Sequence, residues 1–182
     1  KLHVGGDLRI ADGLRTGGEL IAGGSLRVEG PVGAGGRMTV AGDLRTGWGV
    51  EAASDLRCGG ELRTGWGLHC AGRLRLDGNA FIGLDLHSEG DLRCTKGLQV
   101  GGELSAQAQL RAGQGIAVGG SIHCAMHIEA GGDGHDVLDR ATHFGADEVV
   151  VGVQAQPVVV QRVNPVAGEF EVAGGDGHRG RQ

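Results

Sequence analysis

The chain has 182 residues, a length that suits one domain with a short appendage. Its formal net charge is −5, and it holds two Trp, three Phe and no Tyr, so basic patches and stacking rings are scarce and no nucleic-acid partner is expected. No apolar run is long enough to cross a bilayer and no signal peptide is visible, so we expect no direct membrane span. Glycine supplies 39 residues, which is typical of low-complexity chains unless the glycines keep a strict register.

The glycines do keep a register between Leu2 and Ala130. Every sixth residue from Leu2 to Ile128 is apolar, which makes 22 consecutive positions without an insertion or deletion. The residue two places further on is small or apolar, as at Val4 and Ile10, and Gly occupies the fourth place 13 times. Such a unit is too short for a helix but holds one brief strand and one bend, in which residues i and i+2 face the same way. The pattern predicts short strands with both of these residues inward.

The coil should close after three such units. Arg follows the apolar residue directly in nine units, and Asp or Glu precedes it in eight, as expected of outward positions. Two nearly identical segments, 43–49 and 61–67, contain Trp48 and Trp66 and begin three units apart. We therefore predict an all-β, triangular, single-stranded β-solenoid (β-helix) of about seven coils, each made of three units, with Trp66 stacked on Trp48 and no internal ligand cavity. Ala80 replaces the inward Leu of its unit, which predicts local repacking.

The four cysteines, Cys58, Cys70, Cys94 and Cys124, all take the inward i+2 position. Cys58 and Cys94 share a column two coils apart, roughly 9.6 Å by strand spacing, whereas a disulfide needs Cα atoms within about 7 Å. We expect free thiols that pack as small hydrophobes. Free thiols favour a reducing compartment, so a cytoplasmic location is expected.

The repeat pattern ends after Ala130. We expect residues 1–130 to form the solenoid, residues 131–173 a capping segment, and residues 174–182 a disordered tail. Within the cap, the sequence predicts a short helix and three strands that cover the unpaired edge of the last coil: helix 136–144 and strands 148–153, 157–163 and 169–172. Lys1 already lies inside a unit, which suggests part of a longer protein.

Stacking of successive coils turns scattered arginines into ladders. Arg57, Arg75, Arg93 and Arg111 should line one face, with Asp55 and Asp91 beside two of them. Arg9, Arg27, Arg45 and Arg63 should line the next, beside Asp7, Asp43 and Glu61. One interpretation is solubilising mixed charge that contributes little per pair. The other is that the Arg57, Arg75, Arg93 and Arg111 stripe contacts an acidic protein partner or a sister rod.

Histidines are the candidate metal ligands. His69 and His87 are ladder neighbours, His123 lies two rungs further on, and His127 follows four residues later. Zinc needs three or four converging ligands, whereas side chains on a flat face diverge. We therefore expect no metal site, no cofactor and no catalytic residue.

Hexapeptide-repeat acyltransferases and trimeric carbonic anhydrases share this architecture and are the enzymes to weigh. Both build their sites between subunits, commonly with loops that interrupt the repeat. Here 22 units pass without a loop, and Gly rather than Ser, Thr, Ala or Val prevails four residues after the aliphatic residue. An enzyme of this kind is the third alternative.

Segments 4–10, 40–46, 89–94 and 100–104 each carry a Gly-Asp-Leu or Gly-Glu-Leu step, and residues 2–130 resemble the repeat core of bactofilins. These are bacterial, polymer-forming cytoskeletal proteins with a triangular right-handed β-helix that associates end to end without nucleotide. The resemblance implies a non-catalytic, self-associating scaffold. Bactofilin cores usually have fewer coils, and a cap at 131–173 would block growth at that end. The alternative is a rigid spacer or binding module of a larger surface or phage-type protein.

Overall fold

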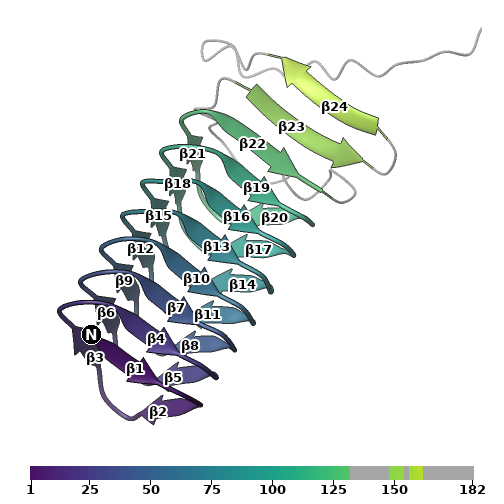
Figure 1. Cartoon of the computed structure of the whole chain (residues 1–182). Helices are drawn as coiled ribbons and strands as arrows, with labels where there is room; N and C mark the ends of the chain where they lie inside the picture. The colour runs from purple at the N-terminus through teal and green to yellow at the C-terminus, as the bar shows by residue number, and fades with distance from the viewer. Residues whose placement is uncertain (132–147, 154–155, 162–182) are drawn as a thin grey trace, which may run out of the picture.

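The computed structural model describes residues 1–131, 148–153 and 156–161, and these residues form three sheets that stack along one axis (Figure 1). Each coil contributes one short strand to each sheet, and the sheets are named here faces A, B and C. Face A contains β1 (Leu2–Val4), β4 (Leu20–Ala22), β7 (Met38–Val40), β10 (Leu56–Cys58), β13 (Leu74–Leu76), β16 (Leu92–Cys94), β19 (Leu110–Ala112), β22 (His127–Ala130), β23 (Glu148–Val153) and β24 (Gln156–Gln161).

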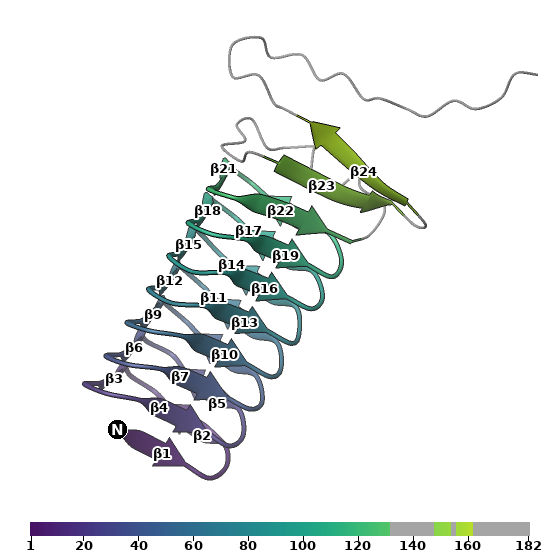
Figure 2. The same ribbon diagram turned by 45° about the horizontal axis from the view of Figure 1, so that its top comes forward.

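Face B contains β2 (Leu8–Ile10), β5 (Leu26–Val28), β8 (Leu44–Thr46), β11 (Leu62–Thr64), β14 (Ala80–Ile82), β17 (Leu98–Val100) and β20 (Ile116–Val118). Face C contains β3 (Leu14–Thr16), β6 (Val32–Ala34), β9 (Val50–Ala52), β12 (Leu68–Cys70), β15 (Leu86–Ser88), β18 (Leu104–Ala106) and β21 (Ile122–Cys124). Figure 2 shows the same stack of coils tilted toward the viewer.

The pairing register confirms the triangular solenoid. From β1 to β22, every strand pairs in parallel with the third strand along the chain, as in Leu44 with Leu62 and Arg57 with Arg75. The corners are bonded from coil to coil as well, since the Gly60 amide donates to the Gly42 carbonyl at 2.9 Å. Backbone groups of strands and corners therefore find their partners along the axis, which is what a single-stranded solenoid requires.

Leucine ladders fill the interior. Leu20, Leu26, Leu44 and Leu62 have no exposed surface, and the i+2 residues are also buried from the second coil onward. Inward hydroxyls bond to the next corner: Thr64 Oγ1 donates to the Trp66 carbonyl at 2.7 Å. Every fully buried side-chain nitrogen or oxygen among the described residues has a hydrogen-bond partner. The interior is thus a dry, satisfied core.

The repacking expected at Ala80 takes the form of a size exchange within one coil. Ala80 stands where the other inward positions carry Leu, Ile, Val or Met, and both Ala80 and Leu76 have no exposed surface. Leu76 is a large residue at an i+2 position that elsewhere on face A is Val, Ala or Cys. Leu76 thus supplies extra buried volume one strand before the position that Ala80 leaves small.

Acidic residues at the corners bond to backbone rather than only to arginine. The carboxylate Oδ1 of Asp43 accepts the Glu61 amide at 2.8 Å, and Asp85 Oδ1 accepts the Glu103 amide at 2.8 Å. Asp55 Oδ1 accepts the Arg73 amide at 2.9 Å, and this backbone bond is the main cause that lowers the pKa of Asp55. An Asp directly before a strand therefore links its coil to the next one through its side chain at several corners.

The chain continues face A beyond the last coil. β23 pairs in parallel with β22, and β24 pairs antiparallel with β23. The strand expected at 148–153 is present with these bounds, and the next one is described from Gln156 to Gln161 rather than from residue 157 to 163. The expected helix 136–144, strand 169–172 and tail 174–182 lie outside the described residues. None of the described part of the chain forms a helix long and apolar enough to cross a membrane.

Candidate association and ligand-binding surfaces

The first coil lies at one end of the described stack. β1, β2 and β3 each stand at the end of their sheets, with no strand beyond them among the described residues. Their inward side chains Leu2, Leu8, Ile10 and Leu14 are only partly buried, whereas Leu20 one rung on has no exposed surface. Such an edge can pair with another strand layer, supplied by a preceding segment of a longer chain or by a second copy.

The other end is arranged differently. On face A the edge of β22 is occupied by β23, which in turn carries β24 (Figure 1). On faces B and C, β20 and β21 are the last described strands of their sheets. Among the described residues, face A thus continues past the last coil, whereas faces B and C do not.

Three of the four arginines of the stripe lie beside two acidic residues. Arg57 and Arg75 both bond to Asp77, at 3.4 and 3.1 Å, and Arg111 lies 2.8 Å from Glu129. The hydrogen bond from Arg75 is the main cause that lowers the pKa of Asp77. The stripe's role as a partner surface stays a prediction.

The arginine partners differ in part from those expected. Asp55 lies 3.4 Å from Arg73, which takes the same place one coil further along, so the ion pair of Asp55 is with Arg73 rather than with Arg57. On the next face, Arg45 does lie near Asp43, at 3.7 Å. The corner bond to the next coil holds the Asp55 carboxylate near Arg73, which explains the difference.

The corner after face B carries an exposed apolar ridge. Trp48 and Trp66 stack as expected, with ring centroids 5.1 Å apart and planes inclined by 10°, and Leu84 follows on the next rung. These three side chains are about half exposed, at 53, 54 and 48%. On face B itself Phe81 is half-buried, and the Arg63 guanidinium lies 4.7 Å from its ring centroid.

The four cysteines are free and buried, as expected. Burial raises the pKa of each thiol, that of Cys58 to about 11. Cys58 Sγ also donates to the Gly42 carbonyl at 3.4 Å, so the thiol is used inside the stack. These thiols pack the corners rather than offer reactive groups.

This state of the thiols leads to a prediction about alkylation. Because the thiolate is the reacting species, we expect iodoacetamide near pH 8, roughly three units below the Cys58 pKa of about 11, to label the folded chain very slowly. Labelling in urea should be fast and should reach all four residues. Mass spectrometry of both samples measures this. Rapid labelling of Cys58 in the folded chain would contradict the buried position.

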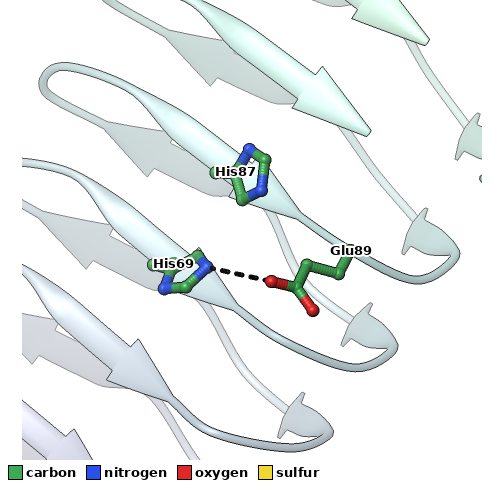
Figure 3. Close-up of side chains that lie close together, drawn as sticks. All are labelled: His69, His87 and Glu89. Carbon is green, nitrogen blue, oxygen red and sulfur yellow. Dashed lines mark ion pairs between the residues drawn. The ribbon is translucent and has the colours of Figure 1, made fainter. Parts of the chain in front are cut away.

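Face C brings His69 and His87 together with Glu89. The two imidazole rings lie on adjacent rungs with centroids 5.2 Å apart, and His69 Nε2 is 3.9 Å from Glu89 Oε1 (Figure 3). One ligand atom of each of the three residues lies within 4.8 Å of the others. The flat-face argument against convergence thus does not hold at this point of the ladder.

The remaining histidines stay apart from this cluster. His123 lies in β21 and pairs with Ser105, which separates it from His87 along face C. His127 begins β22 on face A. Sequence reasoning missed Glu89, which lies at the corner two residues after His87. The sequence did offer a signal: counting back from Glu89 by one coil and by two coils gives Ala71 and Ala53, so a carboxylate appears at a corner position that is otherwise small.

Comparisons with known proteins return no match to this chain. No protein-family model matches it, no curated protein matches it, and no solved structure matches it.

Proposed function

We propose that the chain is a non-catalytic structural scaffold, a self-associating β-solenoid of the bactofilin-like cytoskeletal type. The observation that carries this proposal is the uninterrupted stack of coils over residues 2–130, in which each coil offers on its edge the backbone groups and inward aliphatic side chains that the next coil covers. The filled core supports a mechanical role, because the described coils hold aliphatic side chains where a binding protein would hold a cavity.

Stacking a second copy on the first coil would extend all three faces at once. Leu2, Leu8 and Leu14 would then become covered as Leu20 and Leu26 are, which removes apolar surface from water at roughly 25 cal/mol per Å². Three edges would gain strand neighbours in the same step. The energetic gain is thus of the same kind that stabilises the solenoid internally.

The pairing of β22 with β23 supports one arrangement of two copies. Because β23 already pairs with β22, a coil docking there would find face A covered. For the chain of residues 1–182, we therefore propose that association joins the first coils of two copies in a two-fold contact, which closes as a pair. Growth beyond a pair then requires a second, lateral contact between rods. The four free thiols suit a reducing compartment, and we propose a cytoplasmic location on that ground.

The test places a charge in the first coil. Ile10→Lys puts an ammonium group where the partner coil would bury it, and burial of an unpaired charge is unfavourable. The matched control is Thr39→Lys, which adds the same charge at an outward position of β7. Circular dichroism should show that both variants keep the β fold.

Sedimentation velocity then decides the proposal. The unmodified chain and Thr39→Lys should form a species of twice the 18.5 kDa chain mass, and Ile10→Lys should remain single. Single rods from the unmodified chain at every concentration would overturn association and favour the rigid-spacer function. If Ile10→Lys and Thr39→Lys weakened association equally, the contact would not lie at the first coil.

A further inference from the structure

We propose that His69, His87 and Glu89 form a binding site for a divalent transition-metal ion of the zinc class. The three side chains come from β12, β15 and the corner after β15, in the middle of face C (Figure 3). They lie several coils along the rod from the first coil, so this site does not depend on self-association.

The ladder brings the three ligands close without any loop. Leu68 pairs with Leu86 and His69 with His87, so the two imidazoles are held one strand spacing apart by the parallel register. The Glu89 side chain reaches back toward the lower rung, and its Oε1 is 3.9 Å from His69 Nε2. Corner position 71, one rung below Glu89, is alanine, which leaves room for this crossing.

The distances suit closure around an ion. The ligand atoms lie within 4.8 Å of one another, whereas ligands about 2.1 Å from a tetrahedral zinc ion are separated by roughly 3.4 Å. His69 and Glu89 are exposed and His87 is half-buried, so side-chain rotation alone can supply the difference. The backbone beneath them is a paired sheet and does not need to move.

The ligand types select the class of metal. Two imidazole nitrogens and one carboxylate oxygen match zinc and its neighbours Cu²⁺ and Ni²⁺, whereas Mg²⁺ and Ca²⁺ take oxygen ligands almost throughout. Three protein ligands on an outward face leave the remaining coordination positions open to water.

The positive charges near the site are offset by acidic partners. Glu51 is the strand partner of His69 on the rung below, and its carboxylate lies 3.9 Å from the Arg15 guanidinium, whose charge it offsets. Arg73 likewise has a partner of its own, since it lies 3.4 Å from Asp55. Ser105 pairs with His87 on the rung above and adds no charge.

The experiment is isothermal titration of the full chain, stripped with a chelator, with Zn²⁺ near neutral pH. We expect one ion per chain. His87→Ala and His69→Ala should each weaken binding by at least about tenfold, because two ligands hold zinc poorly in water. Glu89→Gln should weaken it while leaving both imidazoles in place. Mg²⁺ should give no heat of binding.

His123→Ala is the matched control, since His123 is an exposed histidine of the same face outside the cluster. It should leave zinc affinity unchanged, and all variants keep the four thiols, so binding to cysteine would not follow this pattern. The melting temperature provides a second readout, because zinc bound to the folded chain should raise it in the unmodified chain but not in His87→Ala. No binding by the unmodified chain, or undiminished binding by His69→Ala and His87→Ala, would overturn the proposal.

Discussion

Replacing Leu62 by alanine is expected to lower the free energy of unfolding by about 3 kcal/mol, within the range measured for buried leucines. Leu62 has no exposed surface and lies between Leu44 and Ala80 on the inner side of face B. The substitution would set two alanines on consecutive rungs, so no neighbour is placed to fill the space. Urea denaturation followed by circular dichroism measures the loss.

Leu8→Ala provides the control for this experiment. Leu8 occupies the same inward position of face B in the first coil, where it is only partly buried. Truncation there removes less buried surface and leaves a hollow that water can enter, so the loss should be clearly smaller. Equal losses at Leu62 and Leu8 would contradict the difference in burial between the first coil and the interior coils.

Replacing Gly83 by alanine is expected to destabilise the rod by about 2 kcal/mol, the typical cost of overpacking that forces a backbone shift. The corner after face B includes stacked glycines, and a Cβ on Gly83 would lie 2.1 Å from the Gly65 carbonyl oxygen. Backbone dihedral angles are not the cause, because Gly83 does not lie in the left-handed region. The close approach of consecutive coils is what excludes the side chain.

Gly17→Ala is the matched control for this substitution. Gly17 takes the equivalent place after its strand in the first coil, and a Cβ there would meet nothing within 4 Å. This variant should be neutral or slightly stabilising, because alanine restricts the unfolded chain. Thermal melts of the two variants against the unmodified chain measure the difference. A neutral Gly83→Ala would mean that the coils are spaced further apart than the structure has them.

The coil architecture was predictable because its cause is local and repeated. An inward residue every six positions specifies the strands, and the repeated tryptophan segment specifies three strands per turn. Trp48 over Trp66 and free, inward cysteines follow from the same count, and the structure confirms both. Ala80 was recognised as an irregularity, but its compensation by Leu76 depends on how two side chains share one corner.

What escaped prediction depends on side-chain conformation at the corners. Counting assigns Asp55 to Arg57, whereas the carboxylate turns to the next coil and bonds the Arg73 amide. In the same way, a strand-based count aligns His69 with His87 but does not show that Glu89 crosses a rung to reach them. The period of the repeat describes strands well and says little about the direction of long side chains at the bends.

Small-angle X-ray scattering of the full chain over a range of concentrations tests most directly whether this rod joins its copies at the first coil. End-to-end association predicts that the maximum dimension increases with concentration while the cross-sectional radius of gyration stays constant. Ile10→Lys should abolish the increase. A cross-section that widens with concentration, or dimensions of a single rod throughout, would contradict the account.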